Sequence, residues 1–141
     1  MELADDDVLL ESAAALSDRS ETRGAVISLV NFRVSAYQGS GLAPPDLLDS
    51  MELLVLFSFR FRRYEASLQN LYRTVRLFHG KPAYTAMDTH PDNAFPAHID
   101  KLFFTLVPLE FDALNDLWRM LGGQLWPSVL YSMRMVRSKN L

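Results

Sequence analysis

The stretch that runs from residue 102 to residue 136 constrains the fold most, because it contains a strand pattern, a helix pattern, a stop and a second strand pattern. Residues 102–107 and 129–136 alternate with the period of two that is typical of strands. Between them, five apolar residues recur with the period of a helix that buries one face: Phe111, Leu114, Leu117, Trp118 and Leu121. Gly122 and Gly123 follow directly, and glycine commonly ends a helix. The stretch therefore predicts a strand–helix–strand unit.

The rest of the chain predicts one more helix and several strands. Residues 25–35 and 50–61 are rich in β-branched and aromatic residues, which favour strands. The second of these reads as a central strand that is covered on both faces over its first half. Weaker strand patterns cover residues 8–10 and 82–87, the latter at a sheet edge. A helix is predicted over residues 64–79 from an apolar stripe with helical spacing: Tyr64, Leu68, Leu71, Val75 and Phe78.

The order of these elements indicates the fold class. The predicted order is strand, strand, helix, short strand, strand, helix and strand, in a chain of 141 residues, which is the length of one domain. We expect an α/β (α+β) fold with a single mixed, mostly antiparallel sheet and two helices packed against it. We expect one domain over residues 1–141, with an irregular N-terminal segment over residues 1–24. Loops over residues 36–49 and 88–97 are long enough to make functional contacts.

Composition excludes several classes of function. The chain has 14 basic and 17 acidic residues, which gives no electrostatic reason to expect nucleic acid or an anionic membrane as a partner. It has no cysteine, and therefore no disulfide and no thiolate chemistry. No apolar run is long enough to span a bilayer, and the N-terminus is acidic, unlike a secretory signal. We therefore expect cytoplasmic synthesis.

Candidate residues for chemistry are few. His90 and His98 share a loop region with three aspartates, but their spacing matches no standard metal motif. The chain has no Gly-x-Ser-x-Gly sequence and no phosphate-binding loop. Glu110, Asp112 and Asp116 lie at the start of the second predicted helix, where negative charge suits the helix dipole. We expect no catalytic, metal or cofactor site, and therefore no enzyme.

Three residues are candidates for contact with a partner. Trp126 lies in a predicted loop between two glycines and a proline, where a tryptophan either packs locally or anchors a partner. Arg134 and Arg137 lie at the end of the last predicted strand, where we expect ion pairs with a neighbouring subunit. Five other arginines surround the first predicted helix: Arg60, Arg62, Arg63, Arg73 and Arg76. We expect these on its polar face or in interface ion pairs rather than on nucleic acid.

The C-terminal stretch also carries a recognisable motif. Its pattern is Asn-x-Leu-Trp, then Leu-Gly-Gly, then Pro-Ser-Val-Leu-Tyr: Asn115, Leu117, Trp118, Leu121, Gly122, Gly123, Pro127, Ser128, Val129, Leu130 and Tyr131. Two upstream segments, ISLVNFR and FRRYEASLQNLYRTVRLFHGKPAYT, resemble other segments of the same protein family, and all three segments come in the order found in that family. Over residues 25–138 the chain resembles the cap or tail-terminator proteins of extracellular contractile injection systems, phage-tail-like needles of the virulence-cassette and antifeeding-prophage type.

This resemblance implies a structural assembly protein with a tail-terminator-like fold. It implies a hexameric ring that caps the distal end of the tube and sheath of an assembled particle. Its partners are then other copies of itself and the sheath and inner-tube subunits, with no cofactor, nucleic acid or membrane. The family's N-terminal amphipathic helix has no counterpart in residues 1–7, which indicates a shortened or trimmed start. Two alternatives stay open: a baseplate or adaptor component of the same machine, and a small cytoplasmic ligand-binding or enzymatic α/β domain.

Overall fold

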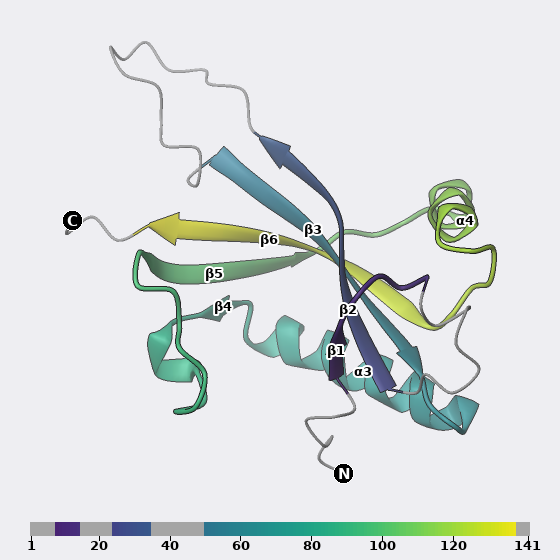
Figure 1. The fold of residues 1–141 in the computed structure, drawn as a ribbon, viewed down its shortest axis with the longest axis horizontal. Helices are drawn as coiled ribbons and strands as arrows, with labels where there is room; N and C mark the ends of the chain where they lie inside the picture. Colours follow the sequence, from purple (N-terminus) through teal and green to yellow (C-terminus); the bar gives the residue numbers. More distant parts are fainter. Residues whose placement is uncertain (1–7, 15–23, 35–49, 138–141) are drawn as a thin grey trace.

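A six-stranded sheet forms the centre of the protein (Figure 1). The computed structural model describes residues 8–14, 24–34 and 50–137. The strands are, in chain order, β1 (Val8–Leu10), β2 (Gly24–Val34), β3 (Met51–Arg60), β4 (Ala83–Tyr84), β5 (Ile99–Leu106) and β6 (Ser128–Arg137). Their order in the sheet is β1-β2-β3-β6-β5-β4, and only β1 and β2 pair in parallel. The predicted single mixed, mostly antiparallel sheet is therefore confirmed.

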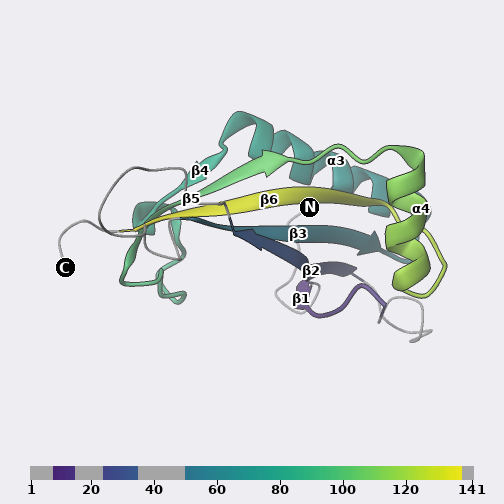
Figure 2. The same cartoon turned by 90° about the horizontal axis from the view of Figure 1, so that it is seen from above.

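Two α-helices cover opposite faces of this sheet. The helices, with one short 3-10 helix, are α3 (Tyr64–Gly80), η2 (Ala86–Asp88) and α4 (Phe111–Met120). The ring of Phe78 in α3 lies 5.4 Å from that of Phe57 in β3. Trp118 of α4 packs instead with Leu56, and neighbouring residues of a strand point to opposite faces. Figure 2 shows α3 along one side of the sheet and α4 across the end where β5 stops and β6 begins.

The glycine stop after α4 is confirmed. Gly122 and Gly123 have φ angles of 115° and 84°, in the region that favours glycine. The backbone N–H of Gly123 donates to the carbonyl of Trp118 at 2.7 Å, which satisfies a carbonyl group at the helix end. The chain is thereby turned back toward the sheet, where β6 begins.

The apolar stripe of α4 packs on the sheet, except for its first residue. Four buried residues form the core on this side: Ala13, Leu56, Trp118 and Leu130. Leu114, Leu117 and Leu121 pack against them, as predicted. Phe111 is 87% exposed, so the prediction that it packs on the sheet is wrong. A helix that crosses the end of a sheet meets it over only part of its length, and Phe111 is the first residue of α4.

The first turns of helix α3 pack through a different face from the one that their apolar residues predict, whereas Phe78 of the predicted stripe packs on the sheet. Its buried residues are Ser67 and Asn70, whereas Tyr64 is 64% and Leu68 is 42% exposed. The Ser67 hydroxyl accepts a hydrogen bond of 2.9 Å from the backbone N–H of Phe61, directly after β3. The buried side of the first helical turns is therefore polar. The prediction of a packed apolar stripe is therefore wrong for the first half of α3.

Burial along β3 is greatest in its second half, not its first. In the second half Leu56, Ser58 and Phe59 are buried, whereas in the first half only Val55 is buried and residues 51–54 are half-buried. Both helices place their contacts on the second half, at Leu56 on one face and Phe57 on the other. The prediction that β3 is central is confirmed, and the prediction that its first half is covered on both faces is wrong.

The weak strand patterns both form strands, at the two edges of the sheet. Residues 8–10 form β1, and of residues 82–87 only Ala83–Tyr84 form a strand, β4. The predicted loop over residues 36–49 lies outside the described residues. Residues 1–7, where the sequence shows no counterpart of the family's N-terminal helix, also lie outside them.

Candidate interaction surfaces

The residues of the C-terminal motif build the corner between α4 and β6. Trp118 is 2% exposed, and its indole Nε1–H donates to the Ser128 hydroxyl at 3.3 Å. The carbonyl of Pro127 accepts a bond of 2.9 Å from the backbone N–H of Phe59, which joins the corner to β3. The other motif residues in this corner are Leu117, Leu121, Gly122, Gly123 and Leu130. These positions therefore hold the fold together.

Tyr131, the last residue of the motif, belongs to an aromatic cluster on the α3 side of the sheet. The ring of Phe78 lies 4.8 Å from Tyr131 and 4.5 Å from Phe104, between centroids. Tyr84 and Phe57 complete the cluster. Burial raises the pKa of the Tyr131 phenol, and the neighbouring Tyr84 raises it further. Tyr131 is therefore a neutral packing residue at ordinary pH.

Asn115 is the motif residue that points out of the corner. It is exposed and lines a shallow groove beside α4, together with Phe111 and Arg119. This groove shares Leu114 and Leu125 with a second one, which continues toward α3. The second groove is mainly apolar and is lined by residues that include Tyr64, Leu68, Leu71 and Trp126.

Trp126 is held locally. It is half-buried and packs against the core cluster on the α4 side. The guanidinium of Arg60 lies 4.6 Å from the centre of its ring, within the range of a cation–π contact. Local packing thus accounts for much of the indole, and the remainder forms part of the groove between α3 and α4.

The structure does not gather the three candidate interface residues. Trp126 precedes β6 and Arg137 ends it, and a ten-residue strand spans about 30 Å. Arg134 is exposed beside Phe103 and Thr105, whereas Arg137 is half-buried. Because three positions separate the two arginines along a strand, their side chains point to opposite faces of the sheet. The three residues therefore do not share one face of the sheet.

The predicted loop over residues 88–97 is fixed at its start. Asp88 forms an ion pair with Lys81 and accepts a hydrogen bond of 2.9 Å from the backbone N–H of Thr85. The hydrogen bond from Lys81, and then that from the Thr85 backbone, lower the pKa of the Asp88 carboxyl. This network pins η2 against the end of α3.

Neither a metal cluster nor a membrane helix is found in the part of the chain that the structure describes. His90 Nδ1 lies 3.4 Å from an Asp92 carboxylate oxygen. Within residues 8–14, 24–34 and 50–137, no three histidine, aspartate or glutamate side chains gather as metal ligands would. Over the same ranges, no helix is long and apolar enough to cross a membrane.

The open edge of β2 is the surface that the sequence did not reveal. β1 pairs with β2 only over residues 25–27, and no described strand pairs with the outer edge of residues 29–34. The backbone N–H of Phe32 donates instead to the side chain of Asn31 at 2.9 Å. Three large apolar side chains along this edge are exposed: Leu29, Phe32 and Val34. A bulge in β2 between Leu29 and Asn31 breaks the strand alternation, so periodicity alone does not reveal that these residues share an exposed edge.

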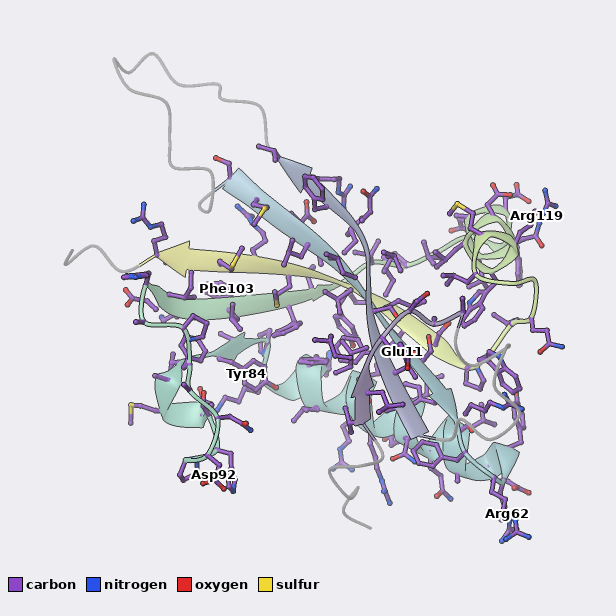
Figure 3. All side chains as sticks on the ribbon, in the orientation of Figure 1. Glu11, Arg62, Tyr84, Asp92, Phe103 and Arg119 are labelled. Carbon is purple, nitrogen blue, oxygen red and sulfur yellow. The ribbon has the colours of Figure 1, made fainter. Side chains whose placement is uncertain are left out.

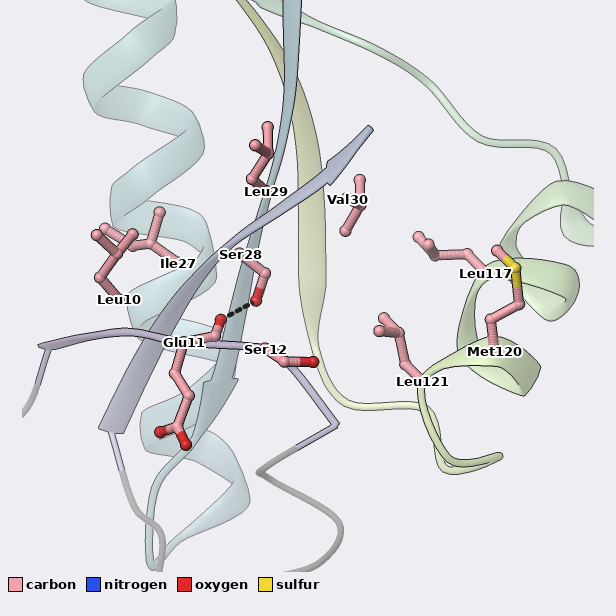
Figure 4. Close-up of a pocket in the computed structure, with 10 residues that line it drawn as sticks. All are labelled: Leu10, Glu11, Ser12, Ile27, Ser28, Leu29, Val30, Leu117, Met120 and Leu121. Atoms are coloured by element: carbon pink, nitrogen blue, oxygen red, sulfur yellow. Dashed lines mark hydrogen bonds between the residues drawn. The ribbon is translucent and has the colours of Figure 1, made fainter. Parts of the chain in front are cut away.

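A cavity of about 500 Å³ lies beside this edge, between β2 and α4 (Figure 4). Val30 and Leu117 lie on opposite sides of it, and most of its lining is aliphatic. Near one end, the Ser28 hydroxyl donates to the backbone carbonyl of Glu11, where β1 has ended. The cavity therefore opens where the sheet edge becomes free.

Comparison with known proteins gives the family. A family model described as the Pvc16 N-terminal domain matches residues 9–140, which is nearly the whole chain. A search of curated proteins found no match. The matched region contains all the segments that resemble contractile-injection-system proteins, residues 25–138, and confirms that resemblance. The chain therefore belongs to the Pvc16 N-terminal domain family, a family of contractile injection systems.

Proposed function

We propose that the protein caps the distal end of the tube and sheath of a contractile injection system, as a hexameric ring that acts by recognition and not by catalysis. The observation that supports this function best is the open edge of β2 beside an apolar cavity, in a member of an injection-system family. An unpaired strand edge is a template for another chain. Such an edge suits a protein that binds the end of a polymer.

The proposed contact is the addition of a strand from the last sheath or tube subunit. Backbone groups of residues 29–34 pair with an extended segment of that subunit. One apolar side chain of the segment enters the cavity between Val30 and Leu117. Because the ring closes on itself, it offers no equivalent edge to a further layer. Growth of the polymer therefore stops.

Deletion of the gene from a producing strain tests this function. We expect tubes and sheaths of irregular or excessive length in negative-stain images, or few intact particles, because the polymer end is left open. Expression of the wild-type chain should restore uniform needles. Uniform, fully capped needles from the deletion strain would refute capping and would favour a baseplate or adaptor role.

A pair of variants tests the surface itself. Leu29→Lys with Phe32→Lys places charge along the open edge, where lysine discourages strand addition. This variant should fail to restore needle length in the deletion strain. Met87→Lys is the matched control, because Met87 is an exposed apolar residue of η2, away from the β2 edge, and it should restore length fully. Restoration by both variants would exclude the β2 edge as the contact.

A further inference from the structure

Helix α3 presents an apolar stripe to solvent. Tyr64, Leu68 and Tyr72 recur at every fourth residue and are all exposed, and Arg76 continues the row. Residues four apart lie on one side of a helix, so these four form a continuous ridge. Ser67 and Asn70 are buried and Phe78 packs on the sheet, which leaves this ridge on the outer side of α3, where Tyr64 and Leu68 also line the groove toward α4.

The surface around this ridge is basic. Arg62 and Arg63 precede the helix, and Arg73 and Arg76 lie in its later turns, all exposed. The one acidic residue among them is Glu65, which lies 3.6 Å from Arg63. In Figure 3, Arg62 projects away from the start of α3. The outer face of α3 therefore combines apolar side chains with positive charge.

Helix α4 presents the opposite charge. Asp112, Asp116 and Met120 recur at every fourth residue, and all three are exposed. Glu110 adds a further negative charge before the first turn, and Arg119 is the one basic residue of the helix. The outer face of α4 is thus an acidic ridge that ends at Met120, which also lines the cavity beside β2.

We propose that the outer face of α3 in one copy of the chain binds the outer face of α4 in the next copy. This inference rests on the proposed ring and names its subunit contact. The two faces are complementary in charge, and each is a ridge of residues spaced by four, the arrangement in which helices interdigitate. The ridge of α4 is about 12 Å long and that of α3 about 18 Å, so one covers the other.

Charge also sets which faces meet. Two α3 faces repel each other, as do two α4 faces, so α3 of one copy is expected to meet α4 of another. A contact between different surfaces gives a ring when the rotation between neighbouring copies closes, and the proposed hexamer supplies that rotation. A protein partner is favoured over nucleic acid, because Leu68 leads into the mainly apolar groove toward α4 and the chain as a whole has a net charge of −3.

Charge reversal on each face tests the contact in the full chain. Arg62→Glu with Arg76→Glu makes both faces acidic, and Asp112→Lys with Asp116→Lys makes both basic. Each variant should self-associate at least about 100-fold more weakly than the wild type in sedimentation velocity. An equimolar mixture of the two should assemble again, because each then supplies the face that the other lacks. A single chain with all four substitutions should also assemble alone.

The controls separate this contact from folding and from capping. Asp92→Lys with Asp100→Lys makes the same charge change away from both helices and should leave self-association unchanged. Circular dichroism must show that every variant is folded. The inference is overturned if either reversed variant associates as the wild type does, or if the mixture does not recover. It is also overturned if the wild type stays monomeric, or if it binds RNA or DNA through α3. If the mixture fails while deletion still gives irregular needles, capping stands and only this contact is wrong.

Discussion

Trp118→Ala should remove a large part of the stability of the fold. A buried tryptophan removes about 150–250 Å² from water, which corresponds to about 4–6 kcal/mol at about 25 cal/mol per Å². Compactness of the unfolded chain lowers this figure by roughly a quarter, to about 3–5 kcal/mol. Trp118 is 2% exposed and belongs to the core cluster, so we expect Trp118→Ala to lower the free energy of unfolding by about 3–5 kcal/mol.

Urea and thermal unfolding, followed by far-UV circular dichroism, measure this loss. For a chain of this length, about 3–5 kcal/mol lowers the Tm by roughly 10 °C or more. Phe111→Ala is the matched control, because Phe111 lies on the same helix and on the same predicted stripe but is exposed. It should change stability by less than about 0.5 kcal/mol. A Trp118→Ala loss below about 1 kcal/mol, or equal losses for the two variants, would refute the burial argument.

Three further predictions concern single positions. Glu52→Ala should lower the free energy of unfolding by about 1–2 kcal/mol, because the Glu52 carboxylate accepts hydrogen bonds from Ser132 and Arg33 and so links three strands. Glu65→Ala, which removes an exposed ion pair, should lower it by less than about 0.5 kcal/mol; urea unfolding measures both. Gly123→Ala should destabilise by about 1 kcal/mol because of its positive φ, whereas Gly80→Ala, within a helix and in open space, should stabilise slightly; the same sign for both would contradict this. The Asp88 carboxyl should titrate below its ordinary value of 3.8 in NMR, because its hydrogen bonds favour the charged form, and Lys81→Met should raise that midpoint. Since the pKa of Asp88 is lowered in the folded chain, its stabilising effect is present above pH 3.8 and is lost as the pH falls through the folded pKa. A titration midpoint of Asp88 at or above 3.8 would contradict this prediction.

Local patterns in the sequence predicted the elements well, because strand and helix periods are local properties of the chain. The stop at Gly122 and Gly123 and both α-helices follow from spacing and from one backbone preference. Which strands become neighbours is not local: β3 pairs with β6, about 75 residues further along the chain, through Leu56 and Leu130. The open edge of β2 is a consequence of that pairing order. It was therefore outside the reach of periodicity.

The candidate surface residues show a second limit. Arg134 and Arg137 are close in sequence, but a strand sends them to opposite faces, and Trp126 lies at the other end of β6. The strand prediction already contained this alternation. Applied to the candidate residues, it would have separated the two arginines without a structure. The position of Trp126 under Arg60 depends instead on packing between distant segments.

Apolar periodicity does not distinguish a core from an interface, and this accounts for most of the wrong predictions. Tyr64, Leu68 and Phe111 follow a helical period because one face of the helix must leave water, but that face can be covered by another subunit as well as by the sheet. Among the described residues, sixteen large hydrophobic residues are exposed, and several of them gather on the α3 ridge and along the β2 edge, as contact surfaces do. Positions where the pattern indicates burial and the isolated chain shows exposure are therefore the first to test for contact with a neighbour. The α3 ridge and the β2 edge are two such surfaces, on different elements, as a ring that also binds a polymer end requires.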